Sequence, residues 1–130
     1  MMVVIVITGM LSAVGLVNYS VIKEKAANRE AKTSLPLIQV AERSYRMEHA
    51  SFYPSSGSIS NTLPADRILI NSNLRLSLPI SSLWTITLYY NAGSGYATAT
   101  RSGRTWRIDF PAGSAETPVC SPCGTPSCPC

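Results

Sequence analysis

The chain has 130 residues and a formal net charge of +4, the size of one small domain with or without an appendage. Its 11 basic and 7 acidic residues are mixed along the sequence, and no basic stripe is interleaved with aromatic residues, so no nucleic-acid partner is predicted. Much of the 45% hydrophobic fraction lies in the first 22 residues, which leaves a modest core for the rest of the chain.

The chain opens with an apolar segment, MMVVIVITGMLSAVGLVNYS, and its first charged residue is Lys23. As a helix, residues 1–22 would be about 33 Å long, enough to cross the hydrocarbon core of a bilayer. No basic residue precedes the apolar run, which argues against a secretory signal peptide. Small residues recur at spacings that let helix backbones approach closely, namely Gly9, Ser12, Ala13 and Gly15. The segment is therefore predicted to be a helix suited both to a membrane and to tight packing on neighbouring helices.

The helical pattern continues beyond the apolar segment to about residue 50. Apolar residues recur at steps of three, four or seven along one stripe, made of Ala27, Ala31, Leu35, Ile38, Tyr45 and Phe52. Charged residues fill the other face, where Glu42 and Arg46 form a favourable pair one turn apart. The predicted helix is about 75 Å long, with a kink or short break expected at Pro36, which clashes with the preceding turn. A helix of this length must project from its domain.

The segment after this helix holds one predicted loop and one predicted short helix. The Ser-rich stretch SSGSISNT follows Pro54 and has no periodicity, so it is predicted to be an exposed connector. The stretch PADRILINSNLRLSLP begins with a proline and predicts a short helix near its start, followed by a loop.

Three later segments alternate apolar and polar residues as strands do, namely LWTITLYY, YATATR and TWRIDF. The turns NAGSG and SGR separate them. This arrangement predicts a three-stranded antiparallel meander with one apolar face and one solvent-exposed face. The helix stripe through Ile38 and Tyr45 can cover the apolar face at Trp84, Ile86, Trp106 and Ile108. The predicted fold is therefore α+β: a long N-terminal helix packs by its C-terminal half on a three-stranded antiparallel sheet.

All four cysteines lie in the tail CSPCGTPSCPC, at Cys120, Cys123, Cys128 and Cys130. An even-numbered cluster favours disulfides in an oxidising compartment, because the spacing leaves little room to wrap a tetrahedral zinc ion. A direct bond between Cys128 and Cys130 would be strained, so crossed or nested pairings are favoured and the connectivity stays open. Since residues 1–119 contain no cysteine, these bonds can close the tail only on itself unless they join subunits.

No residue pattern points to catalysis. His49 is the single histidine and is interpreted as an exposed residue at the helix end. Asp66, Asp109 and Glu116 are too scattered to suggest a carboxylate pair. No phosphate-binding loop, nucleophile elbow or haem attachment motif occurs. The sequence therefore predicts neither an enzyme nor a cofactor nor a metal site.

Two stretches carry a resemblance to a known family. The segment MMVVIVITGMLSAVGLVNYS resembles the N-terminal segment of type IV pilins and of the related pseudopilins of type II secretion. The stretch AERSYRMEHASFYPSSG resembles the place where the pilin helix ends, with spaced aromatic residues and a terminal Tyr-Pro. The resemblance covers the first fifty-odd residues. Together with the patterns above it divides the chain into a long helix (1–53, with the apolar segment 1–22), a globular pilin domain (54–119) and a Cys-rich tail (120–130).

The chain departs from the family pattern at two places. Mature pilins begin with a methylated aromatic residue followed shortly by a glutamate, and neither precedes Met1. We therefore expect either that the first residues and the leader are missing from this sequence or that the protein dispenses with them. Val17 stands where the family usually has a helix-breaking proline, so local melting of the helix would rest on Gly9 and Gly15.

The resemblance implies a structural subunit of an extracellular type IV pilus-like filament, a helical homopolymer of identical chains. Its precursor would cross the bacterial inner membrane as a single span and would be handled by pilus or secretion assembly machinery. The filament core would be formed by Val3, Val4, Val6, Ile7, Gly9, Ser12, Ala13, Gly15 and Leu16.

Two alternative functions remain open at this point. One is the major pseudopilin of a type II secretion system, and the other is a single-span membrane protein that presents a small binding domain. Secretion pseudopilins often resemble a calcium-binding type with acidic residues near the C-terminus. Here that region holds only Asp109 and Glu116 besides the cysteines, which favours the pilus.

Overall fold

A computed structural model of the chain describes residues 2–79, 83–91, 93–111, 113–122 and 128, with the backbone alone for helix residues 2–6, 8–18 and 20. Two helices and five strands follow one another in this part of the chain. In chain order they are α1 (Met2–His49), β1 (Gly57–Ser60), α2 (Pro64–Leu74), β2 (Thr85–Asn91), β3 (Ser94–Arg101), β4 (Arg104–Asp109) and β5 (Val119–Ser121).

The strands form one antiparallel sheet in the order β1-β2-β3-β4-β5. The predicted meander is present as β2, β3 and β4, but the prediction of three strands is wrong, because β1 and β5 extend the sheet at its two edges. The stretch predicted to be a connector contributes β1, in which Ile59 pairs with Leu88 of β2. The tail contributes β5, in which Cys120 pairs with Trp106 of β4. Strands of four and three residues are too short for alternation to identify them, and pairing with a neighbouring strand decides their conformation.

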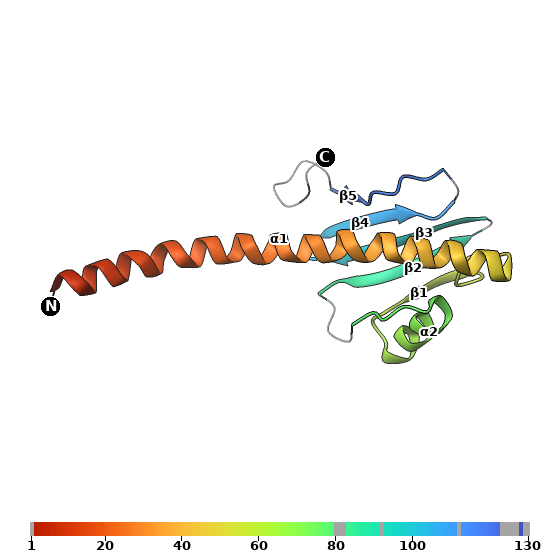
Figure 1. The fold of residues 1–130 in the computed structure, drawn as a ribbon, viewed down its shortest axis with the longest axis horizontal. Coiled ribbons are helices and arrows are strands. Elements are labelled where there is room, and N and C mark those ends of the chain that lie inside the picture. Colours follow the sequence, from red (N-terminus) through yellow and green to blue (C-terminus); the bar gives the residue numbers. More distant parts are fainter. Residues whose placement is uncertain (1, 80–82, 92, 112, 123–127, 129–130) are drawn as a thin grey trace.

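Helix α1 crosses one face of the sheet with its second half, and its first half projects beyond the sheet (Figure 1). Of the kink or short break expected at Pro36, the break does not occur, because the helix is continuous from Met2 to His49. Pro36 removes one helical hydrogen bond, but the flanking residues Leu35 and Ile38 are fully buried against the sheet. We attribute the continuity to this packing, since tertiary contacts outweigh local preference in a docked helix.

The β3–β4 hairpin turns at Ser102 and Gly103, whose φ angles of 48° and 76° are both positive. Two central residues of this kind make the type I′ turn that fits the twist of paired strands, in agreement with the predicted tight hairpin at SGR. Gly95 is required for a different reason, because Phe110 packs directly on its backbone. A Cβ on Gly95 would lie 2.7 Å from a ring carbon of Phe110.

The core lies between α1 and the sheet, and it contains the predicted apolar stripe apart from Tyr45, together with the inward faces of the strands. From the helices and the stretch after α1 it contains Ala27, Ala31, Leu35, Ile38, Phe52, Ile70 and Leu74. From the sheet and the tail it contains Trp84, Ile86, Leu88, Ala97, Ala99, Trp106, Ile108, Phe110, Cys120 and Cys128. Helix α2 packs beside α1 near the β1 edge, where Ile70 and Leu74 close the core (Figure 1).

Candidate functional site: the projecting helix and its anchorage

The described side chains among residues 2–22 of α1 are exposed. They are Ile7, Tyr19, Val21 and Ile22, and among the described side chains of α1 the first buried one is that of Ala27. The residues predicted to build a filament core belong to the backbone of this half, and the side chains of all but Ile7 lie outside those described: Val3, Val4, Val6, Gly9, Ser12, Ala13, Gly15 and Leu16. Gly9 and Gly15, the predicted melting points, also lie within the unbroken helix.

Exposed apolar residues also lie on the outward face of α1, most of them in its docked half. At about 100° per residue, the exposed positions 22, 26, 29, 33, 37, 40, 44 and 47 fall on one side of α1, opposite the buried stripe that faces the sheet. The large apolar residues on this side are Ile22, Leu37, Val40 and Met47, and each is more than 60% exposed. Isolated exposed apolar residues are ordinary, but Leu37, Val40 and Met47 lie within three turns on one side of the helix, and such a group indicates a surface suited to a partner. Between Ile22 and Leu37 the same side carries the polar residues Arg29 and Thr33.

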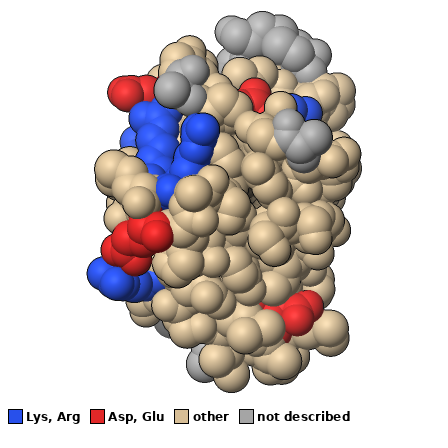
Figure 2. All heavy atoms as spheres, turned by 90° about the vertical axis from the view of Figure 1, so that its right-hand side faces the viewer, with Lys and Arg blue, Asp and Glu red and all other residues tan. Residues whose placement is uncertain are grey.

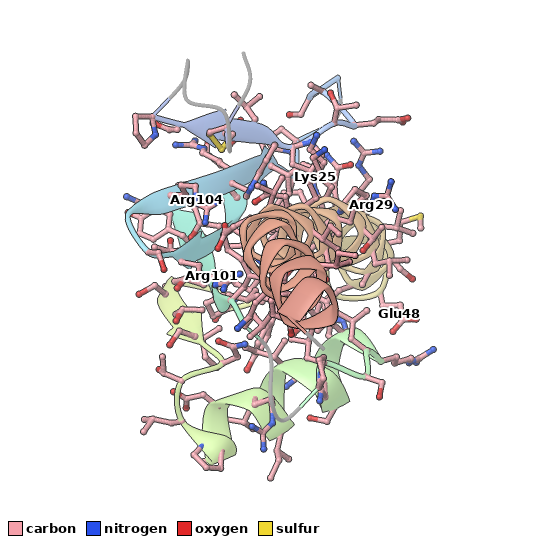
Figure 3. All side chains as sticks on the ribbon, turned by 90° about the vertical axis from the view of Figure 1, so that its left-hand side faces the viewer. Lys25, Arg29, Glu48, Arg101 and Arg104 are labelled. Carbon is pink, nitrogen blue, oxygen red and sulfur yellow. A yellow bond between two sulfur atoms is a disulfide. The ribbon has the colours of Figure 1, made fainter. Side chains whose placement is uncertain are left out.

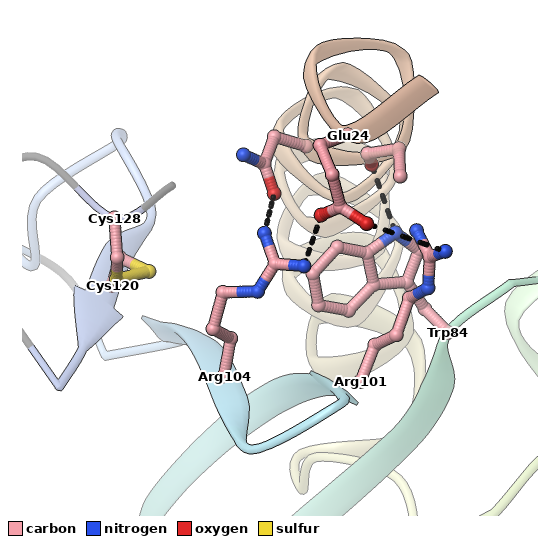
Figure 4. A network of polar contacts seen from close by, with 8 residues as sticks. Glu24, Trp84, Arg101, Arg104, Cys120 and Cys128 are labelled. Carbon is pink, nitrogen blue, oxygen red and sulfur yellow. Dashed lines mark hydrogen bonds and ion pairs between the residues drawn. A yellow bond between two sulfur atoms is a disulfide. The ribbon is translucent and has the colours of Figure 1, made fainter. Parts of the chain in front are cut away.

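A polar clamp fixes α1 to the sheet where the projecting half begins (Figure 4). The Arg104 guanidinium donates to the Glu24 carboxylate and, at 3.3 Å, to Asn28 Oδ1. Arg101 lies 3.8 Å from the other Glu24 oxygen. The Trp84 indole N–H donates to the Ala27 carbonyl at 2.8 Å. Because both arginines flank the β3–β4 turn, the tight hairpin holds the helix at the position where it leaves the domain.

The clamp has more positive than negative charge. The hydrogen bond from Arg104 is the main reason that the pKa of Glu24 is lowered below its usual value. Arg101 and Arg104 approach α1 from the sheet, whereas Lys25 and Arg29 lie on its open side (Figure 3). The end of the domain from which the apolar half emerges therefore carries a set of basic side chains around the helix.

Two buried polar side chains of α1 bind the segments that follow the helix and the sheet. Gln39 donates to the carbonyls of Asp109 and Ala115 at 2.6 and 3.3 Å. Glu42 accepts the Tyr53 N–H at 2.8 Å, and its second oxygen has no hydrogen-bond partner among the described residues. Burial raises the pKa of Glu42 to about 8, with the Tyr53 hydrogen bond acting in the opposite direction. The expected surface pair between Glu42 and Arg46 is therefore wrong, because Glu42 faces the core.

The structure brings the predicted helix–sheet residues together. Ile38, Trp84, Ile86, Trp106 and Ile108 are all in the buried core, and Tyr45 packs against its margin as a partly buried residue. Tyr45 also stacks on the exposed His49 ring, with ring centroids 4.1 Å apart. Sequence reasoning missed Gln39 and Glu42, although both lie on the same face as Leu35 and Ile38, and a polar residue on an apolar stripe was the available signal.

The C-terminal region contains one disulfide among the described residues, between Cys120 and Cys128. Cys123 and Cys130 lie outside the described residues. The expectation that such bonds close the tail only on itself misses the position of Cys120, which belongs to β5 and is buried beside Cys128 in the core. The disulfide therefore attaches the tail to the sheet, because one of its ends is a residue of the last strand.

The described part of the chain holds neither a metal-binding cluster nor a membrane-spanning helix. No group of three or more His, Cys, Asp or Glu side chains in it is placed to hold a metal ion. Within the same residues, no helix is both long and apolar enough to cross a membrane.

The architecture is pilin-like: a long N-terminal helix packs on an antiparallel sheet, and a disulfide lies near the C-terminus. Comparisons with models of protein families, with curated proteins and with solved structures find no match to this chain.

Proposed function

We propose that the chain is the structural subunit of an extracellular type IV pilus-like filament, assembled through its apolar N-terminal helix. The observation that carries the proposal is the division of α1: the helix runs unbroken from Met2 to His49, but its packing on the sheet begins only at Glu24 and Ala27. The projecting part coincides with the uncharged segment 1–22 of the sequence.

An apolar helix that projects from its own domain must be buried in another apolar environment to be shielded from water. Burial of apolar surface contributes about 25 cal/mol of stability per Å². A single chain folded in this way leaves the apolar surface of the projecting half exposed to water, so it does not gain this stabilisation. Two environments can cover it: a bilayer before assembly and a bundle of identical helices afterwards. In both, an unpaired charge would lack water and would be costly, which accounts for the absence of charge before Lys23.

The outward face of the docked half supports the same proposal. Because Leu37, Val40 and Met47 lie on one side of the docked half and remain exposed, a neighbouring helix that packs on the projecting half can also contact α1 along the domain. The clamp at Glu24 and Arg104 would hold all subunits at one angle between helix and domain, which a regular helical polymer requires.

The test is a charge placed in the proposed filament core. Val6→Asp should abolish filament formation while residues 55–122 remain folded, because the carboxylate would be buried without a partner. Val119→Asp is the matched control: the same substitution at an exposed residue of β5 should leave assembly intact. The measurement is negative-stain microscopy of material sheared from cells that express each variant.

Filaments of normal yield from the Val6→Asp variant would contradict the proposal. If the unmodified chain stays in the membrane fraction and never forms a filament, a membrane-anchored binding domain would replace the pilus as the better explanation.

A further inference from the structure

The net positive charge of the chain lies at the end of the domain from which the projecting half of α1 emerges. Residues 23–32 of α1 and the hairpin residues 101–104 together hold six basic and two acidic side chains, whereas the rest of the chain holds five of each. The formal net charge of +4 therefore belongs to this one end. We call its basic residues the basic collar: Lys23, Lys25, Arg29, Lys32, Arg101 and Arg104.

The basic collar surrounds the helix because two distant segments contribute to it. Arg104 donates to the Glu24 carboxylate, and Arg101 lies 3.8 Å from the same carboxylate, which places both arginines beside the first turn after the apolar segment. Seen from the projecting end of α1, Lys25 and Arg29 lie on the open side of the helix, opposite the two hairpin arginines (Figure 3). All four collar residues of α1 are exposed, so they are accessible to a partner.

The opposite end of the domain is more evenly charged. There Arg43 lies 3.8 Å from Glu116, and Arg75 lies 3.4 Å from Glu48. Figure 2 looks onto this end and shows Lys and Arg side chains next to Asp and Glu side chains. A partner that is attracted by positive charge is therefore directed to the end from which the apolar segment projects.

The basic collar lies at the depth of lipid headgroups when residues 1–22 occupy a bilayer. At 1.5 Å per residue, Lys25 lies about 5 Å and Arg29 about 11 Å beyond Ile22 along the helix axis, and helical side chains lean back toward the N-terminus. A headgroup layer is about 5–8 Å thick on each side of the hydrocarbon, and charges interact across about 10 Å of water at moderate salt. Tyr19, which is 68% exposed, lies one turn before Lys23, and tyrosine is enriched at the boundary between hydrocarbon and headgroups.

We propose that the basic collar binds the headgroups of anionic phospholipids while the apolar segment is inserted in a bilayer. The collar can act in this way only at the membrane stage of the proposed function, on which this inference rests. Charge complementarity selects the lipid, because a phosphatidylglycerol headgroup is an anion whereas a phosphatidylcholine headgroup has no net charge. A single Lys or Arg near the surface strengthens binding to anionic lipid about fivefold.

The experiment identifies the lipid that lies next to the protein when the full chain is reconstituted into phosphatidylcholine vesicles. Trace amounts of spin-labelled phosphatidylglycerol or phosphatidylcholine report, by electron paramagnetic resonance, the fraction of each lipid whose motion is restricted by the protein. At low salt we expect the restricted fraction to favour phosphatidylglycerol about fivefold. In about 1 M NaCl, where the Debye length is about 3 Å, this preference should disappear.

The double substitution Lys25→Gln with Arg29→Gln tests the basic collar and leaves the clamp between Glu24 and Arg104 in place. It removes two of the four exposed collar charges, so the free energy of attraction should be halved and the preference should fall from about fivefold to about twofold. Arg46→Gln with Arg75→Gln is the matched control. It removes the same charge from two exposed residues at the opposite end of the domain and should leave the preference unchanged.

Equal restriction of the two lipids, or an undiminished preference in the Lys25→Gln, Arg29→Gln variant, would overturn the inference and leave the proposed function intact. If neither lipid is restricted, the apolar segment is not inserted, and the membrane stage of the proposed function fails together with the inference. If sodium phosphate abolishes the preference at an ionic strength at which sodium chloride preserves it, the collar binds the free phosphate ion and the bilayer is not its ligand.

Discussion

The two halves of α1 share one continuous backbone but find their partners in different places. Residues 1–22 carry no charge, and the side chains described there, such as Ile7 and Tyr19, are exposed. Residues 23–49 mix charged and apolar side chains, and one stripe of them is buried on the sheet. The second half is therefore stabilised within the chain, whereas under the proposed function the first half is stabilised only by a membrane or by other copies.

Helix formation and helix packing therefore have different causes in this chain. Local propensity and spacing specify a helix in both halves, yet only the amphipathic half has a partner in its own domain. Changes in the first half should therefore alter assembly and leave folding intact, and changes beneath the second half should do the reverse.

The largest effect is expected from deletion of residues 1–22. The truncated chain should remain a folded monomer, because the described core contains no residue before Ala27, and it should lose filament formation completely. Circular dichroism and size-exclusion chromatography measure folding and oligomeric state. If the truncated chain still forms normal filaments, the first half of α1 is not needed for assembly, and the proposed division of roles between the two halves is wrong.

Trp106→Ala tests the docked half. The Trp106 ring is buried under α1, so its loss should destabilise the fold by roughly 3–5 kcal/mol, measured by urea unfolding. Trp106→Phe is the matched control and should cost less, because the ring is largely retained and the lost indole N–H has no partner among the described residues. If the alanine variant loses less than about 1 kcal/mol of unfolding free energy, the sheet face that carries Trp106 does not pack against α1.

Glu42→Gln should change how stability depends on pH. Burial raises the pKa of Glu42 to about 8, so its contribution to stability is complete below the unfolded-state pKa near 4.5 and is lost as the pH rises toward 8. Between about pH 5 and pH 7 the unmodified chain should lose roughly 2–3 kcal/mol through this group. The glutamine variant lacks this loss, and parallel stability curves for the two proteins would show that Glu42 is not a buried acid.

The sequence by itself predicted the elements with strong local signals. The 3.6-residue spacing of apolar residues from Ala27 to Phe52 predicted α1 and its buried face, and alternation predicted β2, β3 and β4 with Trp84 and Trp106 inward. Gly103 in SGR predicted the hairpin because two positive φ angles are required there. These features depend on neighbours within a few residues, so a pattern in one sequence can reveal them.

The tertiary structure alone decided the features that depend on distant residues. Strands β1 and β5 exist because β2 and β4 offer unpaired edges to four-residue and three-residue segments. The helix passes through Pro36 unbroken, and packing outweighs the lost hydrogen bond. Glu24, Glu42 and Arg43 are all charged residues of one helix, but the first pairs with a hairpin, the second is buried and the third lines a hollow. Their roles depend on residues up to 80 positions away, because the environment of a charge is created by the chain segments that fold against it.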